Sequence, residues 1–270
     1  MRPGYNRLHI HIIIRTPLLF LFKPKVIVSK VAQFRSSLIE LFPSRECGMS
    51  PGMPAVTTLH QDRRDGPLIG LIADSHGRAK TMAAALEYLK AERCTHLYHL
   101  GDICDSLHPE TADACVELLQ DYQVKSVKGN NDHSIVVNQA SRKTPSIRPE
   151  TLHYLEQLPL VIQTGRTIMA HSLPFEKELG LACMVGAMTH DYARVFFRSF
   201  GDCILFRGHS HSPDIAWQDC EGRIVSANIS LEQTINITER LPCIVTCGAL
   251  DQGLCLLWSL TDSSVTSLRF

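Results

Sequence analysis

Three short runs within residues 68–127, two of them apolar, are predicted as strands and each ends in a polar turn; the first two turns lead into segments with helical periodicity. In the first of these segments Met82, Leu86 and Leu89 repeat along one helix face. Strands that alternate with helices in this way favour a largely parallel α/β sheet, whose polar turns emerge at one edge. The three runs are LIGLIA (68–73), HLYHL (96–100) and VKSV (124–127).

The second half of the chain has a different pattern. Helices are predicted over residues 149–159 and 188–200, and each precedes a predicted strand and loop, RTIMAHS and CILFRGHSHSP. After Pro213 the chain contains short apolar runs separated by turn residues, which predicts one hairpin over residues 215–227 and another over residues 243–260. We therefore expect a second sheet that is mostly antiparallel.

Charge is distributed unevenly although the 270 residues carry no net charge. Residues 1–66 hold ten Lys and Arg against four Asp and Glu, whereas residues 67–270 hold seventeen against twenty-three. We expect an N-terminal extension over residues 1–66, poorly ordered or absent from the natural product, and one domain over residues 67–270. The acidic domain argues against long polyanions such as nucleic acids as partners and fits small substrates better.

The extension contains the most apolar window of the chain, over residues 9–22, but Arg15 and Pro17 interrupt it. It falls short of the ~20 residues of a membrane-spanning helix, so we expect no membrane span. The basic composition is also compatible with a transit peptide, while a start at Met49 or Met53 would leave residues 1–52 out of the natural product.

The ten cysteines are scattered and include no CxxC pair. We expect reduced cysteines that act as small apolar side chains in a cytoplasmic protein. A homo-oligomer remains open at this stage.

Every predicted strand with a following polar loop ends in oxygen or imidazole groups. His209 and His211, two positions apart, are expected on one side of the chain, where their rings can converge. Each group alone could be a helix cap, a turn residue or an ordinary histidine. Together they suit divalent cations such as Mn, Fe or Zn, and seven groups exceed the needs of one ion and are enough for two if a carboxylate bridges them. The seven groups are Asp74, His76, Asp102, Asn130, His171, His209 and His211.

Five short motifs carry these groups: DSH (74–76), GD (101–102), GNND (129–132), AHS (170–172) and GHSH (208–211). In this order and spacing they resemble the calcineurin-like metallophosphoesterase superfamily, whose pattern is DxH, GD, GNH[DE], H and GHxH. The resemblance covers about residues 68–212. It is strongest to the small single-domain phosphodiesterase type and implies a four-layer α/β/β/α sandwich of two mixed sheets.

The resemblance also implies two divalent metal ions, with Mn as the first expectation and Fe, Zn, Ni or Mg as alternatives. One ion would take Asp74, His76 and His211, and Asp102 would bridge to the other. A hydroxide shared by the ions would attack phosphorus in line, without a covalent enzyme intermediate. The second ion would take Asn130, His171 and His209, and the groups expected to be catalytic are Asp102, Asn130 and His171.

One position departs from the family pattern, because Asn131 stands where the family often has a histidine that assists the leaving group. An amide can bind a phosphate oxygen but cannot act as a general acid. The departure favours substrates with good leaving groups, or another acid such as His133. For His133 itself the favoured interpretation is a solvated residue that opens the next helix. Weaker candidates are Arg78 and Arg207 for phosphate binding, and His99 and Asp105 for orienting ligands.

The sequence thus predicts a hydrolase, a dinuclear metal-dependent phosphoesterase that cleaves a small phosphodiester or phosphomonoester. The acidic domain and the missing histidine favour diesters slightly. Two alternatives remain, a non-catalytic scaffold protein on the same fold and a nuclease with the same metal centre; a scaffold should have lost several ligand positions, and a nuclease should carry a basic groove.

Overall fold

The computed structural model describes residues 66–270. The expectations for residues 1–66 therefore lie, apart from Gly66, outside the described residues. None of the helices in residues 66–270 has the length and apolarity that a membrane crossing requires. The nine cysteines of this part are all free, and seven of them are buried, as expected for reduced cysteines in a core.

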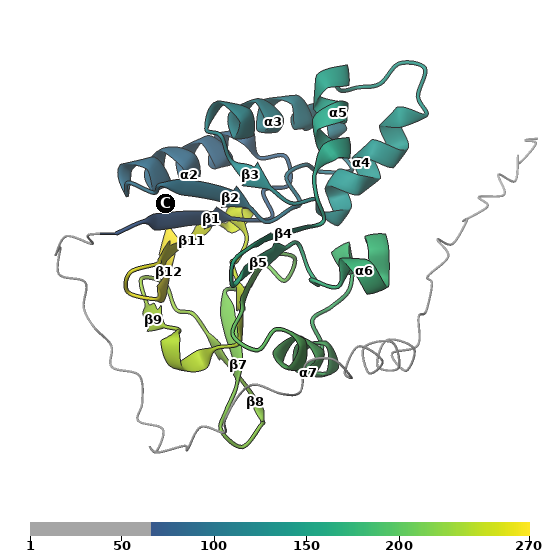
Figure 1. Cartoon of the computed structure of the whole chain (residues 1–270). Helices are drawn as coiled ribbons and strands as arrows, with labels where there is room; N and C mark the ends of the chain where they lie inside the picture. Colours follow the sequence, from purple (N-terminus) through teal and green to yellow (C-terminus); the bar gives the residue numbers. More distant parts are fainter. Residues whose placement is uncertain (1–65) are drawn as a thin grey trace, which may run out of the picture. The chain divides into compact units, whose positions relative to one another are not determined.

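The first half of the domain forms the predicted strand–helix units (Figure 1). Strands β1, β2 and β3 pair in parallel, in the order β3-β2-β1. Helix α2 buries Met82, Leu86 and Leu89 on the face that the sequence predicts. The elements are β1 (Leu68–Ile72), α2 (Ala79–Ala91), β2 (His96–His99), η2 (Pro109–Thr111), α3 (Ala112–Asp121), β3 (Lys125–Ser126), α4 (Asn130–Ala140) and α5 (Pro149–Gln157).

The second half supplies a further set of strands and two α-helices. Strands β5, β6 and β10 pair in parallel, while β4, β7 and β8 pair antiparallel to their neighbours. The elements are β4 (Val161–Thr164), β5 (Thr167–Ala170), α6 (Glu176–Leu179), η3 (Gly180–Met184), α7 (His190–Ser199), β6 (Ile204–Arg207), β7 (Asp214–Gln218), β8 (Ile224–Asn228), β9 (Thr234–Asn236), η4 (Thr238–Arg240), β10 (Cys243–Thr246), η5 (Leu250–Gln252), β11 (Leu254–Ser259) and β12 (Ser264–Arg269).

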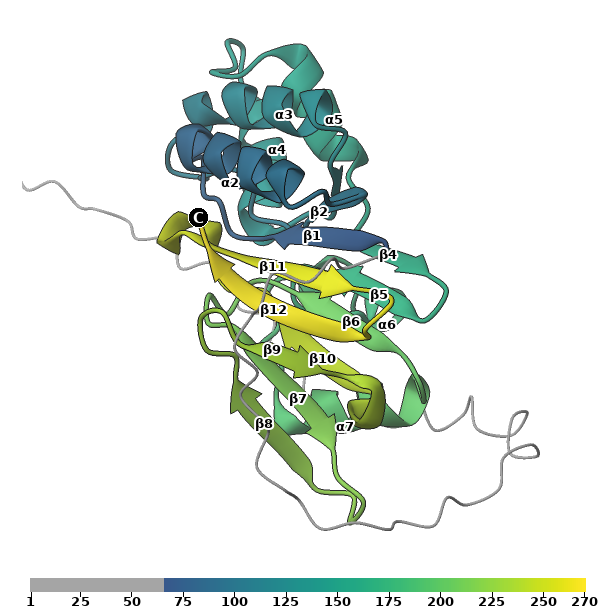
Figure 2. The ribbon, with the colours of Figure 1, turned by 90° about the vertical axis from the view of Figure 1, so that its left-hand side faces the viewer.

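These elements form four layers, which Figures 1 and 2 show from two sides. The sheet β3-β2-β1-β11-β12-β9 packs on the sheet β4-β5-β6-β10-β7-β8. Between the two sheets lies a core that includes Leu71, Phe206 and Trp258. A second core joins the first sheet to α2, α3, α4 and α5, and a third joins the other sheet to α6, η3 and α7. The four-layer sandwich of two mixed sheets is confirmed.

Two predictions for the strands after Pro213 are wrong: the hairpin over residues 243–260, and the placement of all these strands in the second sheet. Residues 243–260 do not form a hairpin, because β10 pairs with β6 and β7 in one sheet whereas β11 pairs with β1 and β12 in the other. The chain crosses between sheets through η5, whose Leu250 N–H donates to the carbonyl of Ala73. Strands after Pro213 therefore contribute to both sheets. All six residues of β11 and all four of β10 are buried, so each of these strands lies inside a sheet with a neighbour on either side.

Candidate metal centre

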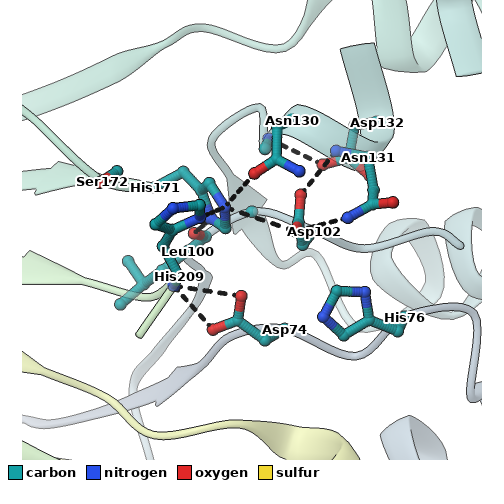
Figure 3. Close-up of polar contacts among 12 residues, drawn as sticks. Asp74, His76, Leu100, Asp102, Asn130, Asn131, Asp132, His171, Ser172 and His209 are labelled. Carbon is teal, nitrogen blue, oxygen red and sulfur yellow. Dashed lines mark hydrogen bonds and ion pairs between the residues drawn. The ribbon is translucent and has the colours of Figure 1, made fainter. Parts of the chain in front are cut away.

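The loops after β1, β2, β3, β5 and β6 meet at one edge of the sandwich. Backbone hydrogen bonds join them: Asp74 N–H donates to Gly101 O at 3.0 Å, and Gly208 N–H donates to His171 O at 3.1 Å. The main chain of His209 also donates to both carboxylate oxygens of Asp74, at 3.1 and 3.0 Å, which ties the two sheets together (Figure 3). The seven predicted groups therefore lie in one connected set of loops.

The backbone of these loops is strained in a way that points to function. Five of the predicted groups have positive φ angles of 44–67°, which residues other than glycine adopt rarely. Such a conformation costs on the order of 1–3 kcal/mol per residue and clusters at binding sites, where the surrounding structure enforces it. The five are Asp74, His76, Asp102, His209 and His211.

Two glycines of the motifs allow the loops to approach each other closely. A Cβ on Gly129 would lie 2.1 Å from the backbone nitrogen of Asp102, and a Cβ on Gly208 would lie 2.7 Å from Oδ2 of Asp74. Neither distance is compatible with a side chain. The glycines before Asn130 and His209 are therefore required by packing.

The first group of side chains consists of Asp74, His76 and His211, whose ligand atoms all lie within 4.8 Å of one another. The Nε2 atoms of His76 and His211 are 3.2 Å apart, and His211 Nε2 lies 3.7 Å from Asp74 Oδ1. Asp74 is fully buried, and its burial raises the pKa of the carboxyl group to about 6, although His171 and His211 act to lower it. A divalent cation at this point would offset the cost of burying the carboxylate.

The second group surrounds His171, which is 1% exposed. Its Nδ1 donates to Leu100 O at 2.9 Å, which leaves Nε2 to face the site. Three atoms with lone pairs surround that nitrogen: His209 Nδ1 at 3.1 Å, Asn130 Oδ1 at 3.2 Å and Asp102 Oδ2 at 3.5 Å. Lone pairs of nitrogen and oxygen that point at one another repel, and a cation between them would turn this repulsion into attraction. These residues therefore fit a divalent metal.

The two carboxylates lie between the groups. Asp74 shares a 4.8 Å cluster with His76 and His211 and another with Asp102 and His171. Burial would raise the pKa of Asp102, but the contact with His171 and the two hydrogen bonds from Asn131 hold it well below its usual range, so this carboxyl group stays ionised. The assignment of Asp102 as the bridge stays a prediction, and Asp74 is placed to share that role.

His209 and His211 do not converge on one point, which corrects the expectation from their spacing. His209 contacts His171, whereas His211 contacts His76. The reason is the backbone: both residues lie in a loop with φ angles of 67° and 61°, so the alternation of an extended strand does not apply.

Asp132 belongs to the site although its role was not recognised from the sequence. It is fully buried, and its carboxylate accepts hydrogen bonds from the backbone N–H groups of Cys104 at 3.0 Å and Gly129 at 2.9 Å. Burial raises the pKa of this carboxyl group to about 6. Asp132 thus joins the loop of Asp102 to the loop of Asn130; the last position of the GNND motif was the signal for it.

The weaker candidates Arg78, Asp105 and His133 lie in different surroundings. Arg78 is exposed at the start of α2, so its contact with substrate stays a prediction. Asp105 accepts a hydrogen bond from Leu107 N–H at 2.8 Å and so shapes a turn. Partial burial and Lys128 lower the pKa of His133, so a smaller fraction of this residue carries a proton that it could donate near neutral pH.

Arg207 requires a correction, because it is only 2% exposed. Its guanidinium donates to Ser172 O at 3.0 Å, to Ser210 Oγ at 2.8 Å and to Thr246 Oγ1 at 3.3 Å. Arg207 therefore fastens the loops after β5 and β6 to β10, and its burial removes the basis for a phosphate contact.

Comparisons with known proteins agree with this site. Residues 68–229 match the family model described as the calcineurin-like phosphoesterase superfamily domain, and the chain belongs to this superfamily. It is therefore assigned to a family of metal-dependent hydrolases that act on phosphoesters.

Two individual relatives illustrate the likeness. An uncharacterized protein of Methanocaldococcus jannaschii is 27% identical over 164 residues, which are 54% of this chain and 63% of that protein, so the chain spans less than two thirds of this relative. A metallophosphoesterase from Sphaerobacter thermophilus shares the fold, with a TM-score of 0.60 and 22% identity over 76% of this chain and 88% of the other.

Proposed function

We propose that the chain is a dinuclear metal-dependent phosphoesterase that hydrolyses a small phosphodiester or phosphomonoester. The observation that carries the proposal is the pair of convergent donor groups, one around His76 and His211 and one around His171 and His209, with Asp74 between them. Each group offers imidazole and oxygen donors, the chemistry that suits Mn, Fe or Zn. The seven proposed ligands are Asp74, His76, Asp102, Asn130, His171, His209 and His211.

The proposed metal ions, when bound, supply Lewis acidity toward phosphoryl oxygens and lower the pKa of water, which is the chemistry that hydrolysis at phosphorus requires. The side chains prepare the site for them. Leu100 O fixes the tautomer of His171, and the main chain of His209 holds the carboxylate of Asp74. These contacts orient the donor atoms before any ligand arrives, which reduces the reorganisation that binding would otherwise require.

The leaving group receives no proton from Asn131 in this proposal. The side-chain amide of Asn131 has no titratable proton, and its Nδ2 donates to Asp102 Oδ2 at 2.8 Å. His133 carries a lowered pKa, so it is a weak alternative at neutral pH. We therefore expect esters of acidic alcohols and phenols to be cleaved much faster than esters of aliphatic alcohols.

The test is hydrolysis of bis-p-nitrophenyl phosphate and p-nitrophenyl phosphate by the full chain. Protein freed of metal with a chelator should be inactive, and added Mn²⁺ should restore turnover of at least one ester. The His171→Ala variant, purified in parallel, should be inactive and so exclude a contaminating phosphatase. The ratio of the two rates would decide between diester and monoester preference.

Two results would contradict the proposal. Turnover by wild type that persists in the chelator would remove the metal from the mechanism. Binding of metal without turnover of any small ester would support a scaffold or a nuclease, which plasmid or oligonucleotide cleavage under the same conditions would separate.

A further inference from the structure

Asn131 forms hydrogen bonds to both carboxylate oxygens of Asp102. The backbone N–H of Asn131 donates to Oδ1 at 2.8 Å, and the side-chain Nδ2 of Asn131 donates to Oδ2 at 2.8 Å (Figure 3). Asp102 is 3% exposed, so water offers little competition for these bonds. The two contacts prevent rotation of the carboxylate and fix the direction of its remaining lone pairs.

The hydrogen bond from the side chain depends on the orientation of the Asn131 amide. Rotation of the amide by 180° would place Oδ1 against the Asp102 carboxylate, where two acceptors would repel each other. The orientation is fixed from the opposite side by Ser106, whose hydroxyl donates to Asn131 Oδ1 at 2.7 Å and whose N–H points to the same oxygen at 3.3 Å. Because the Ser106 donors lie on one side of the amide and the Asp102 carboxylate on the other, the positions of Oδ1 and Nδ2 are assigned without ambiguity.

A tight turn holds Ser106 in this place. Asp105 Oδ1 accepts the N–H of Leu107 at 2.8 Å, and Asp105 O accepts the N–H of His108 at 3.1 Å. Both bonds close the chain around Ser106 in the manner of an Asx turn. The chain of contacts runs from this turn through Ser106 and Asn131 to Asp102.

We propose that Ser106 is a positioning residue that acts through Asn131 to hold Asp102 in its ligand orientation. The inference rests on the proposed function, because its consequence is tighter metal binding at the site. Hydrogen-bond partners of metal ligands typically change metal affinity by about 10- to 100-fold. Since the N–H of Ser106 remains in Ser106→Ala, we expect a loss near the lower end of that range.

The chain contains a matched control for this contact. At the far end of α4, Ser146 donates its N–H at 3.0 Å and its hydroxyl at 3.2 Å to the amide oxygen of Gln139. Gln139 lies nine positions after Asn130, about 13 Å along a helix. Ser146→Ala therefore removes the same kind of hydrogen bond without touching the site.

The first readout is Mn²⁺ affinity of the full chain, measured by competition with a fluorescent chelator. We expect Ser106→Ala to bind about tenfold more weakly, Ser106→Thr to stay close to wild type because it keeps the hydroxyl, and Ser146→Ala to be unchanged. If Ser106 acts through Asn131, then Ser106→Ala should add less than about twofold in an Asn131→Ala background.

The second readout needs no metal and no activity. In amide NMR spectra of the metal-free chain, the side-chain NH₂ pair of Asn131, identified by its loss in Asn131→Ala, should shift in Ser106→Ala and not in Ser146→Ala. An unshifted pair would refute the contact itself.

The outcomes separate this proposal from the proposed function. Wild type that binds no Mn²⁺ would overturn the proposed function, while the NMR shift would still judge the Ser106 contact. Two results would overturn the role of Ser106 alone, provided that wild type binds Mn²⁺. The first is equal affinity of Ser106→Ala and Ser146→Ala for Mn²⁺. The second is a full additional loss of affinity when Ser106→Ala is combined with Asn131→Ala.

Discussion

His99 allows a quantitative prediction, because it is fully buried and links two ligand loops without being a proposed ligand. Ser75 Oγ donates its proton to Ile103 O at 3.0 Å, so the ring must donate from Nε2 to Ser75 Oγ at 2.8 Å. Nδ1 then accepts the N–H of Gly101 at 3.2 Å. The neutral ring therefore satisfies both of its neighbours, and a proton on Nδ1 would break the second bond.

The magnitude follows from the pKa of this ring. Burial, followed by the charge of His171, lowers the pKa of His99 from 6.5 to about 3. Between these values the unfolded chain binds a proton that the folded chain does not, so the stability from His99 is complete above pH 6.5 and is lost as the pH falls toward 3. At pH 5 the loss is about 2 kcal/mol, since each pH unit contributes about 1.36 kcal/mol.

The perturbation is His99→Gln, which removes the titrating ring. Urea unfolding of the metal-free full chain can be followed through the fluorescence of its two tryptophans, of which Trp258 is 5% exposed in β11. We expect wild type to be more stable than His99→Gln at pH 7.5, and the difference in unfolding free energy to shrink by about 2 kcal/mol at pH 5. Groups common to both proteins largely cancel in this difference.

A difference that is the same at both pH values would refute the reasoning. The control is His96→Gln, which changes an exposed histidine at the other end of β2 and should alter stability by less than about 0.5 kcal/mol. A comparable loss in both variants would show that burial of His99 is not the cause.

Three further predictions concern the loops. His171→Ala and Asp102→Asn should each lower kcat/KM for bis-p-nitrophenyl phosphate by about 100-fold or more with an unchanged circular dichroism spectrum; wild-type turnover in both would sink the assignment. Gly129→Ala should destabilise the chain by about 1–3 kcal/mol in thermal melts, whereas Gly201→Ala, whose new Cβ meets nothing within 4 Å, should not. Asp132→Ala leaves two buried N–H groups unpaired and should cost about 2–6 kcal/mol in urea unfolding; a loss under 1 kcal/mol would contradict that role.

The sequence was sufficient for the parts of the fold that depend on local pattern. The helical spacing of Met82, Leu86 and Leu89 predicts the buried face of α2, and the polar turns predict where strand ends meet. The pairing of β10 and β11 in different sheets could not be predicted, because both strands are apolar runs and nothing local decides which neighbour covers them.

The sequence predicted that the candidate groups would lie close together, but it did not predict their geometry. Alternation along a strand suggested that His209 and His211 would face one point, but their left-handed backbone sends them to different partners. Arg207 is a similar case: its place beside GHSH suggested a phosphate contact, whereas its guanidinium is buried and donates to Ser172, Ser210 and Thr246. Such outcomes depend on tertiary contacts that a single sequence does not display.

The central claim is that the seven groups hold two cations, and counting metal ions tests it most directly. The full chain would be stripped with a chelator, saturated with Mn²⁺, freed of excess metal and measured by elemental analysis, with His211→Ala prepared in parallel. The account predicts two ions per chain in wild type and one in the variant, because the group around His171 remains intact. One ion or none in wild type, or two in His211→Ala, would contradict it.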